Sequence, residues 1–244
     1  MRWLLSQRWD DLLFAHWPVR PHSLCRLLPA GVQPDVRDGN AWLGVVAFRM
    51  TDTRAAGLWP PRGLGSIPEL NLRTYVTVGG TPGVWFLTLD TSSPLFVSVG
   101  RALYGLSYRR AQMLVVRDGM RIHYTSRYGH CSFVARYEPV GRAAAAEPDS
   151  FEEWLFERYR LFARRGRDLV TAEIRHAPWL LQAVDAAIDL NTLAPRGLRT
   201  ASEPLLHFSR GVDALISPPF RLAKGARRPR RSPQAPLLAA AREA

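Results

Sequence analysis

The clearest pattern along the chain is a strict alternation of polar and apolar side chains over residues 69–78. A period of two places successive side chains on opposite faces of a β-strand. One face of the predicted strand carries Glu69, Asn71, Arg73, Tyr75 and Thr77, and the other carries Leu70, Leu72, Thr74, Val76 and Val78. The pattern therefore predicts a strand with one polar face and one largely apolar face.

Further strands are predicted on both sides of this segment, with short connections between them. They span residues 40–50, 83–90, 112–117, 120–127, 130–138, 168–175 and 204–216. Gly79-Gly80 and Asp118-Gly119 are hairpin signals, because glycine adopts the backbone conformation that tight turns require. Strands joined by such turns pair antiparallel, so the segments predict an antiparallel meander.

Helices are predicted at four places between the strands. They span residues 21–28, 95–104, 150–165 and 178–190, and residues 141–149 are predicted to form an alanine-rich connector. The third helix has the strongest start signal, because Ser150 and Glu153 have the spacing of a capping box. Arg164 and Arg165 suit its C-terminal end, where positive charge is favourable. Strands with a few interspersed helices predict an α+β fold dominated by antiparallel sheet.

The composition predicts one globular domain over residues 1–222. Apolar residues make up 47% of the 244 residues and charged residues 22%, which is typical of a globular protein. No run approaches the roughly 18 apolar residues of a membrane span. The first residues lack the pattern of a secretory signal, so a cytoplasmic location is expected. Cys25 and Cys131 are expected to be buried free thiols, although a single disulfide stays open.

The net charge of +12 is unevenly distributed along the chain, and almost all of the basic residues are arginine. Residues 223–244 carry +5 and are rich in Arg, Pro and Ala, so we expect a basic disordered tail. Arginine makes up 32 of the 33 basic residues, and Lys224 is the single lysine. The run over residues 227–231 leaves nonspecific binding of nucleic acid open, but no base-stacking motif accompanies it. Specific nucleic-acid binding is therefore not expected.

Several segments together resemble the YqjF-like family of conserved uncharacterised proteins. The matching pieces lie at residues 9–14, 16–19, 41–46, 48–50, 68–76, 83–86, 176–180 and 207–209. The resemblance spans most of residues 1–222, and the order and spacing of the pieces carry it. It implies a fold similar to that of acetoacetate decarboxylase, with a curved, mostly antiparallel sheet or partial barrel around a small-molecule pocket and a few flanking helices.

The resemblance to the decarboxylases breaks down at their catalytic lysine. Their motif Gly-Arg-Glu-x-x-Gly-x-Pro-Lys-Lys aligns with residues 100–109, where Tyr108 and Arg109 replace the two lysines. A Schiff base requires a primary amine that can lose its proton, and neither a phenol nor a guanidinium supplies one. Since Lys224 lies at the edge of the predicted tail, the sequence argues against Schiff-base chemistry. No cofactor is expected.

The polar face of residues 69–78 supplies the candidate site. If it lines the concave interior of the sheet while the apolar face packs against helices, Arg73 can pair with a carboxylate and Asn71 can fix its orientation. Glu69 is the candidate catalytic acid or base. Arg49 is a second candidate anion-binding group, and the resemblance adds Tyr108 and Arg109 as ligand contacts. The alternative is an ordinary strand whose polar face meets water.

Three classes of function stay open at this point. The leading prediction is a protein that binds a small polar or acidic organic molecule and catalyses a lysine-independent reaction on it. The second is a non-catalytic carrier or interaction protein, and the third is nonspecific nucleic-acid binding through the tail. The six histidines show no metal-ligand spacing, so no metal is expected. A buried Glu69 close to Arg49 or Arg73 would favour an enzyme.

Overall fold

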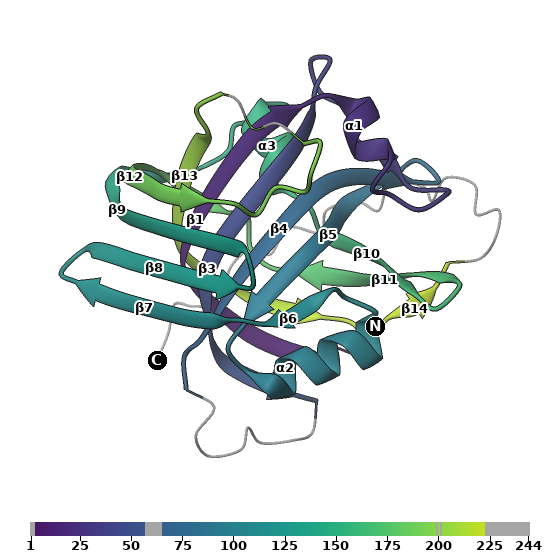
Figure 1. Cartoon of the computed structure of the whole chain (residues 1–244), viewed down its shortest axis with the longest axis horizontal. Helices are drawn as coiled ribbons and strands as arrows, with labels where there is room; N and C mark the ends of the chain where they lie inside the picture. The colour runs from purple at the N-terminus through teal and green to yellow at the C-terminus, as the bar shows by residue number, and fades with distance from the viewer. Residues whose placement is uncertain (1–2, 57–64, 199, 201, 223–244) are drawn as a thin grey trace, which may run out of the picture.

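Strands from both ends of the chain close into a ring in the computed structural model, which describes residues 3–56, 65–198, 200 and 202–222 (Figure 1). In order around the ring, the strands are β1 (Leu5–Val19), β3 (Ala41–Ala55), β4 (Ile67–Val78), β5 (Thr81–Thr91), β10 (Arg160–Arg165), β11 (Asp168–Arg175) and β13 (Leu205–Ile216). The predicted tail over residues 223–244 and Lys224 lie outside the described residues.

The ring is held by long antiparallel pairings and by two short ones. β1 pairs along most of its length with both β3 and β13. In contrast, β10 pairs with β5 in parallel at only two positions, and β11 pairs with β13 at only two. Three short strands join the rim, namely β2 (Gln33–Pro34) beside β4, β6 (Tyr108–Arg110) beside β5 and β14 (Phe220–Arg221) beside β11. The sheet is therefore curved and mostly antiparallel, with a parallel minority.

A second layer of strands covers one outer wall of the ring. The sheet continues from β13 through β12 (Leu180–Asn191), β9 (Cys131–Ala145), β8 (Arg121–Tyr128) and β7 (Gln112–Asp118) and crosses in front of β1 and β3 (Figure 1). Leu70 and Leu72, from the apolar face of β4, pack in one cluster with Tyr124, Phe133 and Tyr137 of this layer. The apolar face of β4 is thus covered by a second sheet and not by the helices that the sequence suggested.

The helices are short and few among the described residues. They are α1 (Pro21–Cys25), α2 (Pro94–Val99), which continues into the π-helical turn η1 (Gly100–Tyr104), and α3 (Phe151–Phe156). Figure 1 shows α2 at the lower end of the ring and α3 near the upper end. None of the helices in the described ranges has the length and apolar character of a membrane span. Cys25 and Cys131 are free thiols, but Cys25 is exposed and Cys131 is half-buried, so neither is fully buried as expected.

The predicted helix over residues 178–190 is wrong, because this segment forms β12. Its alanines favour a helix when taken alone. However, the segment also alternates, with Val184 and Ala186 partly buried and Asp185 and Ala187 exposed. The partners β9 and β13 lie on either side of it, and pairing with distant strands outweighs local propensity.

The predicted helix over residues 150–165 begins where expected but ends early. The Ser150 hydroxyl accepts a hydrogen bond from the Glu153 backbone N–H at 3.1 Å, as a capping box requires. The helix ends at Phe156, and residues 160–165 form β10. β10 pairs with β11 along its whole length, and this pairing with another strand outweighs the local preference for a helix. The connector predicted over residues 141–149 is also too long, because β9 extends to Ala145.

Candidate functional site

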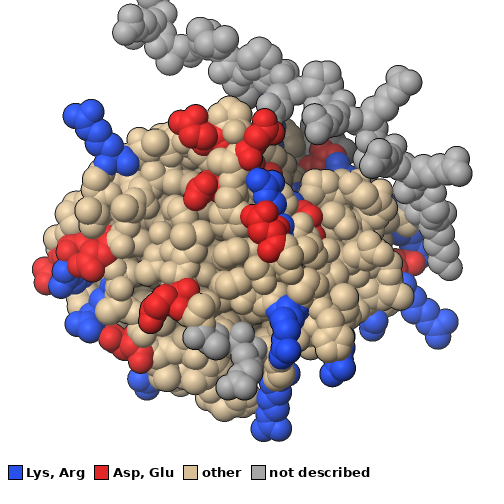
Figure 2. Space-filling view, turned by 90° about the horizontal axis from the view of Figure 1, so that it is seen from above, with Lys and Arg blue, Asp and Glu red and all other residues tan. Residues whose placement is uncertain are grey.

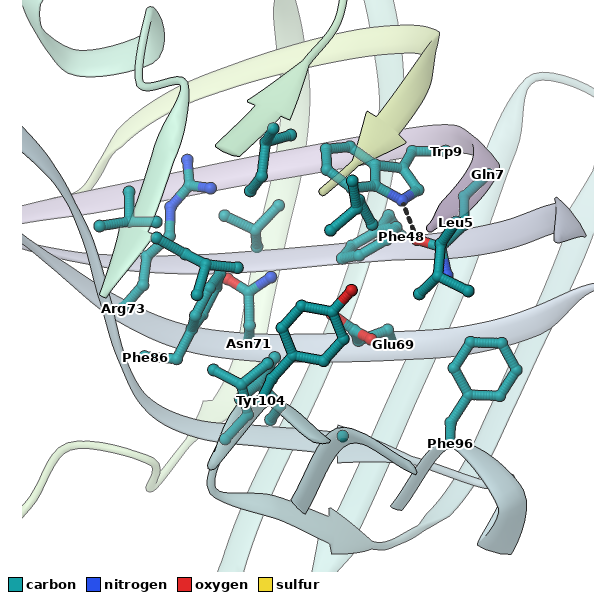
Figure 3. A pocket seen from close by; sticks show the side chains of 18 of the residues that line it. Leu5, Gln7, Trp9, Phe48, Glu69, Asn71, Arg73, Phe86, Phe96 and Tyr104 are labelled. Atoms are coloured by element: carbon teal, nitrogen blue, oxygen red, sulfur yellow. Dashed lines mark hydrogen bonds between the residues drawn. The ribbon is translucent and has the colours of Figure 1, made fainter. Parts of the chain in front are cut away.

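The ring encloses a cavity of about 580 Å³ with a mostly apolar wall. Strands β1, β3, β4, β5, β10, β11 and β13 all contribute to the wall, together with α2, η1 and the end of α3. Its aromatic side chains are Trp9, Phe14, Phe48, Phe86, Phe96, Tyr104, Tyr108, Phe156 and Trp179 (Figure 3 labels several of them). Such a lining, with few polar groups, is typical of sites for small organic molecules.

The polar face of β4 supplies three of the polar side chains that line the cavity. Glu69, Asn71 and Arg73 follow one another along the strand, with Arg73 and Glu69 at opposite sides in Figure 3. Tyr75, the next residue on this face, is fully buried beyond the cavity lining, where its hydroxyl lies 2.6 Å from His16 Nε2. The polar face of β4 therefore points into the ring, which is one of the two placements that the sequence left open.

Glu69 and Tyr108 form a buried hydrogen-bonded pair at one side of the cavity. The Tyr108 hydroxyl donates to Glu69 Oε2 at 2.7 Å, and Glu69 is only 4% exposed. Burial raises the pKa of Glu69 to about 7, with the charge of Asp90 adding to the effect, while hydrogen bonds from Tyr108 and Asn71 oppose it. A carboxyl group that titrates near neutral pH can both accept and donate a proton, so Glu69 has the properties of a general acid or base.

The ring of Tyr108 packs directly on the backbone of Gly100. Gly100 opens the π-helical turn η1, and a Cβ atom built on it would lie only 2.3 Å from Tyr108 Cδ2. π-Helical turns occur frequently at functional sites. Here the absence of a side chain at Gly100 lets the phenol approach close enough to reach Glu69.

Replacing Gly100 with alanine is expected to displace Tyr108 and break its hydrogen bond to Glu69. Crowding of this kind destabilises a packed site by about 1–3 kcal/mol. Urea denaturation of the full chain at pH 6 measures the loss. Gly65→Ala is the matched control, because a Cβ atom at Gly65 meets nothing within 4 Å. Equal stability of Gly100→Ala and the wild type would show that the Tyr108 ring does not pack on Gly100.

Arg73 brings a guanidinium to the cavity without a carboxylate partner among the described residues. Its Nε is buried and makes no hydrogen bond, and its Cζ lies 5.6 Å from the ring centres of Phe14 and Tyr75. Buried polar groups are normally hydrogen-bonded, so an unsatisfied one in a cavity wall indicates a place for a ligand or water.

Two of the candidate residues lie outside the cavity lining. Arg49 pairs with Asp11 at 2.5 Å, and Asp11 also pairs with Arg117 of β7, so these contacts tie the ring to the second layer. Arg109 pairs with the buried Asp90 at 2.6 Å. The structure thus brings together Glu69, Asn71, Arg73 and Tyr108 and separates Arg49 and Arg109 from them.

Several polar side chains of the cavity wall were not predicted from the sequence. Arg158, in the loop between α3 and β10, lines the cavity but belongs to no periodic pattern. His176 and Trp179 also line it, and the only signal for them was the family-like piece at residues 176–180. His207, on β13, packs against the ring of Phe156 and is not among the lining residues.

Metal-ligating clusters and basic stripes are the signs of two other classes of site. No group of three or more His, Cys, Asp or Glu side chains there is arranged to hold a metal ion. On the face shown in Figure 2, arginines are interspersed with acidic side chains. Charge on this face is therefore mixed, unlike the continuous positive surface of a nucleic-acid binder.

The fold is similar to that of solved acetoacetate decarboxylase-like proteins. Acetoacetate decarboxylase from Legionella pneumophila superposes with a TM-score of 0.66 at 14% identity, covering 89% of this chain and 87% of that one. The enduracididine biosynthesis enzyme MppR, complexed with pyruvate, superposes with a TM-score of 0.65 at 14% identity, covering 91% and 92%. At these identities the similarity concerns the fold alone.

The sequence comparisons give a closer relationship. The "Uncharacterized protein YqjF" of Bacillus subtilis (strain 168) is 39% identical over 221 residues, which cover 88% of this chain and 91% of the relative. Residues 6–213 match DUF2071, a family described as "Uncharacterized conserved protein". These matches confirm the YqjF-like resemblance, and the chain belongs to the DUF2071 family.

Proposed function

We propose that the cavity binds a small organic acid and that Arg73 anchors its carboxylate. The observation that carries the proposal is the guanidinium of Arg73, which lines an otherwise mostly apolar cavity with a buried Nε that has no hydrogen-bond partner. Arginine presents a planar set of donors that matches a carboxylate, and such charge-assisted bonds are stronger in an enclosed site than in water. Asn71, whose buried Oδ1 is also unsatisfied, then orients the ligand.

Glu69 and Tyr108 are proposed to exchange a proton with the bound acid. The pair lies on the same cavity wall as Arg73, so a ligand held by Arg73 extends toward it. This arrangement favours enolisation, dehydration or hydrolysis with charge stabilised by arginine, none of which needs a lysine. The burial of Glu69 on the strand that carries Arg73 supports an enzyme over a non-catalytic carrier.

The related folds support a small acid as the ligand. One solved structure of MppR is complexed with pyruvate, which is itself a carboxylic acid. In the present chain the decarboxylase lysines are replaced by Tyr108 and Arg109, and Lys224 is the single lysine. We therefore propose acid binding and proton transfer without an imine intermediate.

Arg73→Gln is expected to weaken carboxylate binding about 10- to 100-fold, the range that follows from losing hydrogen bonds to a charged group. Hexanoate serves as the probe, and the fluorescence of Trp9 and Trp179 in the cavity wall reports its binding. Arg136→Gln is the matched control, because Arg136 lies on the exposed surface of β9 and pairs with Asp189. Native mass spectrometry of the freshly purified protein would identify any acid that is retained.

Two results would overturn the proposal. The first is wild-type protein that binds no carboxylic acid, retained or added. The second is an Arg73→Gln variant that is folded and binds hexanoate as tightly as the wild type.

A further inference from the structure

A second guanidinium in the cavity wall has an unused donor. Arg158 is 7% exposed, donates from Nη1 to Asp35 Oδ2 at 2.5 Å and from Nε to the Trp154 carbonyl at 2.6 Å. Its Nη2 is buried and has no hydrogen-bond partner. Because the other two nitrogens hold the side chain in place, Nη2 is a fixed and unpartnered donor in a side chain that lines the cavity.

Arg73 and Arg158 lie around the same aromatic ring. Their Cζ atoms are 5.6 Å and 5.4 Å from the ring centre of Tyr75, and both residues line the cavity. Burial lowers the pKa of Arg158, and the charge of Arg73 lowers it further, although Asp35 opposes both effects. Of these two cations only Arg158 has a carboxylate partner among the described residues, namely Asp35, so this part of the cavity keeps a positive charge that one monoanion would balance.

The rest of the cavity suits an apolar body and not a very small acid. Its volume of about 580 Å³ lies within the range of sites that hold drug-sized ligands. The wall includes Phe14, Phe48 and Phe86, and in the neighbouring strands Phe86 lies opposite Arg73 and Phe48 opposite Glu69. A three-carbon acid held by Arg73 would leave most of this apolar surface in contact with water, which is unfavourable.

We propose that the cavity selects an amphipathic monocarboxylic acid, with the carboxylate held jointly by Arg73 and Arg158 and a medium-length alkyl or aromatic body lying against the phenylalanines toward Glu69. This inference rests on the proposed function, because it takes organic acids as the ligands of the cavity. To the proposed function it adds the class of acid, which is amphipathic, and Arg158 as a second residue that binds the carboxylate.

The test measures the affinity of the full chain for straight-chain acids from acetate to dodecanoate at pH 8, where all of them are ionised. Each added methylene is expected to tighten binding about fourfold until the cavity is full, as burial of one CH₂ group predicts. Octan-1-ol, which has the same chain length as octanoate but no charge, is expected to bind at least about tenfold more weakly, because it forms no charge-assisted hydrogen bonds.

Variants separate the two parts of the proposal. Arg158→Gln is expected to weaken octanoate binding about tenfold or more while leaving octan-1-ol binding unchanged, because only the acid uses the free guanidinium donor. Val99→Phe fills part of the wall next to Gly100, at the Glu69–Tyr108 end of the cavity, so it is expected to weaken octanoate binding while acetate binding stays the same. Since Arg158 also contacts Asp35, its variant is first checked for a native circular dichroism spectrum. Should Arg158→Gln not fold, Val99→Phe and the octan-1-ol comparison still test the class of ligand.

The outcomes distinguish this inference from the proposed function. If acetate or pyruvate binds as tightly as octanoate, acid binding stands but selection for an amphipathic acid is wrong. If octanoate and octan-1-ol bind equally well, anchoring by the arginines is wrong. If no acid of any length binds, the proposed function falls as well.

Discussion

Glu69→Gln is expected to stabilise the protein at pH 8 and to leave its stability almost unchanged at pH 4. Glu69 has a pKa of about 7 in the folded protein and 4.5 in its unperturbed state. Because the folded protein holds this proton more tightly than the unfolded chain does, wild-type stability falls as the pH rises from 4.5 to 7. The loss amounts to about 3 kcal/mol at 1.36 kcal/mol per pKa unit. Glutamine resembles the protonated carboxyl group and does not titrate, so the variant escapes this loss.

Urea denaturation of both proteins between pH 4 and pH 8 measures the effect. The buried His16 and the partly buried His207 have lowered pKa values, mainly through burial, so protonating them at acid pH destabilises the fold. That contribution is shared by wild type and variant and cancels in their difference. Glu138→Gln, on the second layer, is the control and is expected to show no such rise with pH. A stability difference that does not grow between pH 4.5 and pH 7 would contradict the raised pKa of Glu69.

Arg109→Met is expected to destabilise the protein by about 3 kcal/mol or more at pH 7, the cost of leaving a buried charge unpaired. Asp90, its partner, has a side chain that is only 2% exposed, and its remaining side-chain hydrogen bond, from Ser126, spans 3.2 Å. The loss of stability therefore comes mainly from the buried Asp90 carboxylate that is left unpaired, and less from the removal of Arg109 itself. Equilibrium denaturation in urea measures it.

A second substitution at Asp90 tests this explanation. Replacing the pair by apolar residues, in Arg109→Met with Asp90→Leu, is expected to recover much of the lost stability, because no buried charge remains. Arg136→Met removes an exposed pair with Asp189 and is expected to leave stability unchanged within error. If Arg109→Met is as stable as the wild type, Asp90 is not buried as the structure places it.

The alternation over residues 69–78 predicted which side chains share one face of β4, because strand periodicity is a local property. Once residues 69–78 form a strand, Glu69, Asn71 and Arg73 must share a face. The same rule explains why Arg49 and Arg109 fall outside the cavity. Phe48 and Tyr108 line it, and the next residue on a strand points the other way.

Contacts between distant parts of the chain could not be predicted from the sequence patterns. Residues 178–190 contain alanines that favour a helix, but they pair with strands from elsewhere in the chain. Arg158 reaches the cavity from a loop, where no period reveals which way a side chain points. The resemblance to a known family supplied the overall fold, while the anchoring role proposed for Arg158 depends on the three-dimensional arrangement.

The pairing of β1 with β13 has a consequence for how the protein is made. Leu5 pairs with Ile216, so the first and last strands of the ring must meet across almost the whole described chain. Contacts between residues so far apart in sequence slow folding, because a long loop must close before they form. During synthesis, β1 leaves the ribosome long before β13 exists, and its buried Leu13 and Phe14 have only one of their two neighbouring strands to cover them. The interval between these two events is when the nascent chain is most exposed to aggregation.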